Sequence, residues 1–252
     1  MILCSLLILR APAQSILFNF DNAPVYTPFP ISLTVGGITA HFTATGAGYS
    51  IQGVTTAPVV PVGFSGNFIY PSSIYGSDLL VSFSVPITDF SILYAPQELA
   101  CDSSATMRVT AYMNSTMVGT ATTNAQAGTW PAETLRFSSM QSFNNVVVHY
   151  DKPPVTGGDY GVIFLADNVA VTPAPSPIVL GSATKLADGS FQFTFTNTPA
   201  MTHTVLCSTN LSLPLSNWYV LGSATEVSSG NYQFIDVQAA NRPSCFYRVK
   251  LP

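Results

Sequence analysis

The chain has 252 residues, of which 47% are apolar and only 8% are charged, whereas roughly 25% of residues are charged in ordinary soluble domains. The net charge is −4 and no run of Lys or Arg occurs, so we expect neither nucleic acid nor an anionic membrane as a partner. No segment approaches the roughly 20 consecutive apolar residues of a membrane-spanning helix. We therefore expect no transmembrane segment.

Residues 1–14 resemble a secretory signal peptide. The apolar run Ile2–Leu9 precedes Ala11-Pro12-Ala13, which has the small residues of a cleavage site. The pattern departs from the usual one because the basic residue Arg10 follows the apolar run instead of preceding it. A buried first strand is the alternative interpretation. The signal peptide predicts a secreted or cell-surface protein.

Residues 15–172 alternate apolar and polar side chains, which is typical of strands that bury one face. No window of 11 or more residues shows a helical period of 3.6 residues. Ten or so strands without helices predict an all-β domain, an antiparallel jelly-roll β-sandwich. The clearest candidate strands are Ile16–Asp21, Ile38–Thr45, Leu79–Val85, Phe90–Tyr94, Met107–Met113, Met117–Thr123, Leu135–Ser138, Val146–Asp151 and Gly161–Thr172.

A proline-rich linker, residues 173–177, is predicted to separate this domain from a smaller one, residues 178–252. Within the smaller domain the sequence Val179–Thr184 recurs as Val220–Thr225. Each copy continues to a turn and then to a stretch that alternates with period two, which predicts two β-hairpins.

The predicted hairpins are Val179–Phe195 and Val220–Asp236, and Thr204–Thr209 and Cys245–Lys250 supply further strands. Six to seven strands in this length favour a small immunoglobulin- or fibronectin-like β-sandwich. A β-propeller is the alternative that the repeat suggests. Two copies cannot close a ring of blades, so we expect the sandwich.

The smaller domain resembles a C-terminal β-sandwich module of secreted proteins from Verrucomicrobia-like bacteria. The similarity rests on Gly189–Phe195, Thr209–Trp218, Val220–Thr225 and Phe246–Val249. It implies export and attachment to a surface or matrix, and it implies no chemistry.

The larger domain resembles exported bacterial jelly-roll domains of surface proteins and, beyond them, carbohydrate-binding modules. The similarity rests on Phe20–Asn22, Val81–Phe83, Phe90–Ile92 and Leu165–Val171. It implies that the domain binds carbohydrate.

Two Asp-Asn pairs lie near the two ends of the larger domain: Asp21 and Asn22 follow the first strand, and Asp167 and Asn168 lie in the last. First and last strands of jelly rolls commonly end near one another, so four oxygen-bearing side chains can meet. Such ligands suit Ca²⁺, and the resemblance to carbohydrate-binding jelly rolls implies a structural calcium about there. The alternative is that both pairs form turns through their own backbone.

Four aromatic residues are candidates for stacking on sugar rings: Trp130, Tyr70, Tyr75 and Tyr112. Trp130 lies in a loop between strands, where a binding aromatic reaches solvent. The alternative is that Trp130 closes the end of the sandwich. Trp218, in the smaller domain, is expected in the core.

Catalytic residues are scarce in this sequence. The three histidines have no spacing typical of a zinc site, and no GxSxG nucleophile motif occurs. His149 and Asp151 share one strand face and, with Asp159, are the candidates for a hydrolase or lyase. A nucleophile is missing from this set, so we expect no enzyme.

The cysteines leave two alternatives open. Cys207 and Cys245 lie in different candidate strands of the smaller domain and can form a disulfide in an oxidising compartment, with Cys101 left free. Free buried thiols at both positions are the other possibility.

The sequence thus predicts an exported, non-catalytic protein that binds or adheres, with polysaccharide or extracellular matrix as partner. Two alternatives remain: a structural surface protein without a small ligand, and a polysaccharide hydrolase or lyase.

Overall fold

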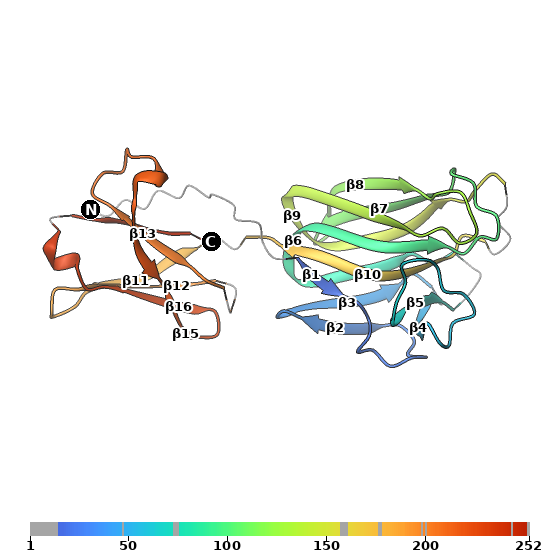
Figure 1. Ribbon diagram of the computed structural model, residues 1–252, viewed down its shortest axis with the longest axis horizontal. Coiled ribbons are helices and arrows are strands. Elements are labelled where there is room, and N and C mark those ends of the chain that lie inside the picture. Colours follow the sequence, from blue (N-terminus) through green and yellow to red (C-terminus); the bar gives the residue numbers. More distant parts are fainter. Residues whose placement is uncertain are drawn as a thin grey trace. The chain divides into compact units, whose positions relative to one another are not determined.

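The computed structural model describes residues 15–46, 48–72, 76–156, 161–175, 178–197, 199, 201–242 and 244–250. The predicted signal peptide, Tyr75 and Asp159 lie outside these residues. The described chain divides into a larger unit that ends at Ala174 and a smaller unit that begins at Pro175. Both units consist of antiparallel strands (Figure 1), so the predicted all-β fold class is confirmed.

None of the described residues belongs to a helix that is long and apolar enough to span a bilayer.

The larger unit has ten strands in its described part, joined by hydrogen bonds into one sheet. They are β1 (Ile16–Phe18), β2 (Ile31–Val35), β3 (Ile38–Ala44), β4 (Tyr49–Gly53), β5 (Asn67–Pro71), β6 (Leu79–Pro96), β7 (Thr106–Met113), β8 (Thr116–Asn124), β9 (Glu133–Lys152) and β10 (Phe164–Pro173). Strand β10 reaches Pro173, the first residue of the predicted linker, because a strand end tolerates a residue without an N–H donor.

Strands β6 and β9 fold this single sheet into two layers. They pair with each other along most of their length, but the register shifts near Ile87. Before this shift the buried side chains of β6 are those of odd-numbered residues, such as Leu79 and Val81. After it they are those of even-numbered residues, such as Phe90 and Ile92. Such a change of parity reverses the face that a strand presents to the core. The β6–β9 ribbon therefore passes from one layer into the other at this bend.

We call the two layers A and B. Layer A contains β2, β3, the first half of β6, the second half of β9, β7 and β8. Layer B contains β4, β5, β10, β1, the second half of β6 and the first half of β9. The inward side chains of both layers form one core cluster, which makes the unit a β-sandwich.

The outer faces of the two layers differ. The outer face of layer B carries a second apolar cluster, in which Phe64 of the β4–β5 loop packs with Phe68, Ala95 and Leu165. On the outer face of layer A, by contrast, most of the outward side chains are half-buried or exposed. The outward side chains of layer A are therefore more open to solvent than the apolar cluster outside layer B.

The smaller unit is a sandwich of two sheets, ordered β11-β12-β16-β15 and β14-β13-β17. Its core cluster is built on Phe193, Phe195, Val205 and Tyr232. Its described elements are β11 (Val179–Lys185), β12 (Phe191–Thr196), β13 (Thr204–Ser208), η1 (Leu215–Asn217), β14 (Tyr219–Ser223), β15 (Thr225–Ser228), β16 (Asn231–Asp236), η2 (Ala239–Asn241) and β17 (Phe246–Lys250).

The sequence repeat gives two different structures. In the first copy β11 and β12 form the predicted hairpin. The second copy is not one hairpin over Val220–Asp236, because β14 pairs with β13 and only β15 pairs with β16. The chain changes sheets at Ala224, whose N–H donates to the carbonyl of His203. The prediction of a second hairpin was wrong in this respect.

The cysteine sulfurs of Cys207 and Cys245 lie 2.10 Å apart, at bonding distance, and join β13 to the segment before β17. Cys101 is a buried free cysteine of the larger unit. Trp218 is buried in the smaller unit, and its indole N–H donates to the carbonyl of Leu213 at 3.1 Å.

Candidate binding face

The outward side chains of layer A stand in rows across its strands, since antiparallel pairing places partner residues side by side. His149 of β9 is the register partner of Arg108 of β7, which in turn faces Thr122 of β8. A second row contains Asn145 of β9 and Tyr112 of β7. The alternation of apolar and polar residues fixes this arrangement, because inward neighbours such as Val148 fill the core.

A chain of four ionisable side chains crosses this face. Asp78, immediately before β6, contacts His149 with 2.5 Å between Oδ1 and Nδ1. His149 Nε2 lies 3.9 Å from Asp151 Oδ1. Arg108 closes the chain, with its Nη2 2.8 Å and its Nε 3.0 Å from the same carboxylate oxygen.

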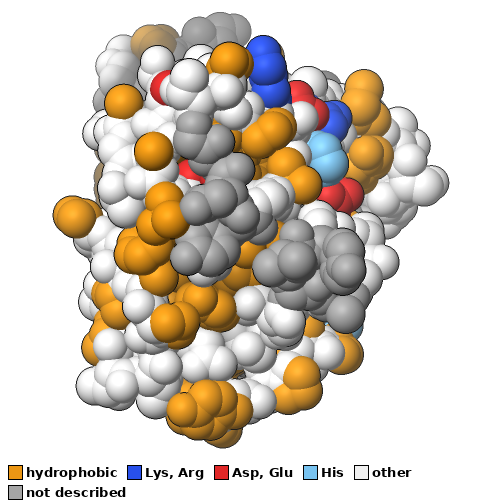
Figure 2. Space-filling model, turned by 90° about the vertical axis from the view of Figure 1, so that its right-hand side faces the viewer, with side chains coloured by type: hydrophobic (Ala, Val, Ile, Leu, Met, Phe, Trp, Pro, Cys, Tyr) orange, Lys and Arg blue, Asp and Glu red, His pale blue; other side chains and the backbone are white. Residues whose placement is uncertain are grey.

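These side chains remain accessible to solvent while they hold one another in place. Their exposed fractions run from 29% for Asp78 to 39% for His149 and Asp151. Each carboxylate oxygen can accept more than one hydrogen bond, so Asp78 and Asp151 retain capacity for donors from a ligand. Figure 2 shows one face of the molecule, on which most of the basic, acidic and His side chains gather in one strip among white and hydrophobic atoms.

Tyr112 supplies an aromatic ring on the same face. It is half-buried, and it lies four residues beyond Arg108 along β7, which corresponds to about 13 Å in an antiparallel strand. The ring and the charged chain can therefore contact neighbouring units of one extended ligand.

The predicted aromatic set does not form one site in the described structure. Tyr70 packs in the cluster outside layer B, and its hydroxyl accepts a hydrogen bond from Gln97 Nε2 at 3.2 Å. Trp130 adjoins the same β6–β7 connection, since its amide N–H donates to the carbonyl of Glu98 at 3.0 Å. Tyr112 lies six residues along β7 from Thr106, and Thr106 is the end of β7 nearest that connection. Six residues of an antiparallel strand span about 20 Å.

Trp130 has an unusual local geometry. Its backbone φ of 48° is in the left-handed region that large residues rarely adopt. Its ring is half-buried, and its indole N–H is buried without a hydrogen-bond partner among the described residues. The polar edge of the ring therefore faces inward, so stacking of Trp130 on a sugar stays a prediction.

The two Asp-Asn pairs approach one another in part. Strand β1 pairs with β10, and both carboxylates contact the chain around the start of β5. The N–H of Asn67, the first residue of β5, donates to Asp21 at 2.9 Å, and the N–H of Ser65 in the preceding loop donates to Asp167 at 3.3 Å. Burial raises the pKa of Asp167 to about 6. The backbone N–H groups of Ser65 and Asn168 act to lower this pKa, whereas the nearby carboxylate of Asp21 raises it further.

Calcium at this place stays a prediction. Asn168 donates its side-chain N–H to Asp167, and Asn22 is exposed. Among the described residues no group of three or more His, Cys, Asp or Glu side chains is placed to hold a metal ion. Asp21 and Asp167 are the two carboxylates that would hold Ca²⁺, whose preferred ligands are oxygens.

The residues of the predicted hydrolase lie on an open sheet face. His149 and Asp151 share that face, as the alternation predicts, but Asp159 lies outside the described residues. The thiol of Cys101 is buried; burial, followed by Glu98 and Asp102, raises its pKa to about 11. Such a thiol is almost wholly protonated at neutral pH and is a weak nucleophile.

Two residues of the face were not among the predicted site residues. Asp78 lies just before the first strand residue of β6, and only the pairing of Leu79 with Val148 shows that it adjoins His149. Arg108 was visible as an outward residue of an alternating strand. A search for outward charges on candidate strands would have found it.

No protein-family model matches this chain, and no curated protein matches it. Among solved structures it is similar to the K1 cleaved adhesin domain of Lys-gingipain from Porphyromonas gingivalis W83, with 11% identity, a TM-score of 0.37, and 64% of this chain and 99% of that chain covered. It is also similar to the CBM32-1, CBM32-2 and M60 catalytic domains of ZmpB from Clostridium perfringens, with 8% identity, a TM-score of 0.30, and 95% of this chain but 38% of that chain covered.

Proposed function

We propose that the protein is exported and non-catalytic, and that the outer face of layer A binds polysaccharide. The observation that carries this proposal is the chain Asp78–His149–Asp151–Arg108, held together on an open face that also bears Tyr112. The remaining outward residues are mostly neutral and polar.

The chemistry of this face suits sugar hydroxyls. Carboxylates accept hydrogen bonds from hydroxyl groups, and the guanidinium of Arg108 donates to their oxygens. Because these side chains already hold one another in place, little rotamer entropy is lost when a ligand binds. The ring of Tyr112 offers an apolar surface for the apolar face of a sugar.

Retention of the full chain on insoluble polysaccharides tests the proposal. Tyr112→Ala should weaken binding by about tenfold, a loss of about 1.4 kcal/mol, with an unchanged melting temperature. Asp151→Asn should weaken it as well, because the amide carries no negative charge to pair with Arg108 and has one acceptor oxygen instead of two. Tyr219→Ala is the matched control, since Tyr219 is 71% exposed in the smaller unit.

A Trp130→Ala variant distinguishes the two candidate binding sites, which are the outer face of layer A and the surface around Trp130. Loss of retention in Trp130→Ala alone would move the binding site to the β6–β7 end of the sandwich and refute the layer A proposal. Absence of binding to every glycan tested, together with lost attachment of cells that lack the protein, would instead support a structural surface protein.

A further inference from the structure

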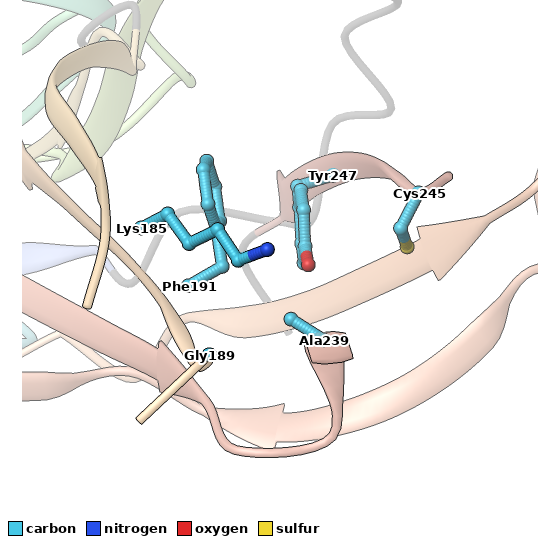
Figure 3. Close-up of a pocket in the computed structure, with 6 residues that line it drawn as sticks. All are labelled: Lys185, Gly189, Phe191, Ala239, Cys245 and Tyr247. Carbon is cyan, nitrogen blue, oxygen red and sulfur yellow. The ribbon is translucent and has the colours of Figure 1, made fainter. Parts of the chain in front are cut away.

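The smaller unit has a recess at one end of its sandwich, with a volume of about 160 Å³. Figure 3 shows its lining, which comes from β11, the β11–β12 turn, β12, η2, β17 and the residue just before β17. The lining residues are Lys185, Gly189, Phe191, Ala239, Cys245 and Tyr247.

One wall of the recess is a fixed aromatic pair. The rings of Phe191 and Tyr247 are stacked, with centroids 5.0 Å apart and planes 14° apart. The hydroxyl of Tyr247 donates to Asp236 Oδ2 at 2.9 Å, and burial together with this carboxylate raises the pKa of Tyr247. The phenol is therefore neutral, and its ring cannot rotate freely. The bond between Cys245 and Cys207 anchors the chain beside it.

The positive charge at the recess belongs to Lys185. The nearby Arg242 is paired with Asp236, which also accepts a hydrogen bond from Tyr247. The ion pairs found within the described residues do not include Lys185. Figure 3 shows the Lys185 ammonium group extending over the recess towards Tyr247. An anionic group of a ligand in the recess would meet this charge.

We propose that the recess binds a six-membered ring that carries a carboxylate. The ring packs against the wall of Phe191 and Tyr247, and the carboxylate contacts the ammonium group of Lys185. The volume is right for one ring, since a protein cavity of about 150 Å³ holds a benzene molecule. This site goes beyond the proposed function because it lies in the other unit and uses none of the residues of layer A.

Two sources share this ligand chemistry: a uronic acid residue of a polysaccharide and an aromatic carboxylate. Titration calorimetry of the full chain with galacturonate, benzoate and neutral galactose distinguishes them. Binding of galacturonate or of benzoate, stronger than that of galactose, supports the proposal and names the source. Failure of both acids to bind overturns it.

Variants test the two parts of the site separately. Lys185→Gln should weaken binding of the acid by about fivefold, the upper range for an exposed ion pair, and Lys185→Arg should restore it. Lys250→Gln is the matched control. Ala239→Leu should abolish binding by filling the recess while it removes no contact of the core.

Unchanged binding in both Lys185→Gln and Ala239→Leu would overturn the proposal. Tyr112→Ala should leave this binding intact, so failure here is distinguishable from failure of the layer A proposal.

Discussion

Asp167 is a carboxyl group that the fold buries completely, beside the second carboxyl group of Asp21. Its pKa rises from an ordinary 3.8 to about 6 in the folded protein, chiefly through burial. The folded state therefore binds a proton more tightly than the unfolded state between these two values. Stability from this residue is greatest at low pH and is lost as the pH rises through about 6.

The first prediction is that Asp167→Asn removes this dependence. Urea unfolding of the wild type and the variant is measured from pH 3.5 to 7.5. As the pH rises from 4 to 6, the unfolding free energy of the wild type should fall relative to that of the variant. A difference that is constant over this range would contradict the assignment.

The second prediction concerns calcium at the same carboxylates. If Asp21 and Asp167 hold the ion, added Ca²⁺ at pH 7 should raise the melting temperature of the wild type, because a ligand that binds the folded state stabilises it. Asp167→Asn should respond much less. An equal shift in both proteins would place the ion elsewhere, and no shift in either would refute a calcium site.

The third prediction rests on His203 in the smaller unit. This imidazole is fully buried and packs against the rings of Phe195 and Tyr232. Burial lowers its pKa, although the carbonyl of Met201 and the charge of Glu226 act in the opposite direction. The smaller unit should lose stability as the pH falls below 6.5, where the unfolded chain becomes protonated.

His203→Phe should flatten this acid dependence between pH 7.5 and 5, as measured by the melting of the smaller unit. His41→Phe is the control, because His41 is exposed in the larger unit. Equal pH dependence in wild type and His203→Phe would show that other groups cause the acid sensitivity.

At the scale of elements, the disulfide between β13 and the segment before β17 closes a loop across 38 positions. A crosslink over this separation stabilises the folded state by about 4 kcal/mol on the chain-entropy estimate. The fourth prediction is that replacing Cys207 and Cys245 together by Ser lowers the unfolding free energy of the smaller unit by about 2 to 4 kcal/mol. An unchanged denaturant midpoint would contradict it.

The elements themselves were predictable to different degrees. Alternation located the outward residues of β7 and of the second half of β9 because one face of each is buried. It split β6 into Leu79–Val85 and Phe90–Tyr94, since the alternation changes parity at the bend near Ile87. The repeat suggested two equal hairpins, but the chain leaves one sheet for the other at Ala224, which depends on packing rather than on local pattern.

At the scale of the whole molecule, the candidate site depends on how the sheet folds over. His149 and Asp151 were predictable as neighbours from their spacing alone. Their contacts with Asp78 and Arg108 follow from strand pairings that the sequence does not reveal. The same fold separates Tyr112 from Trp130, and this separation could not be predicted from the aromatic residues of the sequence alone.

The proposed polysaccharide site lies on layer A and on no other surface of the larger unit. Chemical-shift mapping by NMR on the full chain, titrated with oligosaccharides of the retained polysaccharide, tests it most directly. We expect the largest shifts at Arg108, Tyr112, Asn145 and His149. Shifts concentrated at Trp130 and the β6–β7 connection, with layer A unaffected, would contradict it.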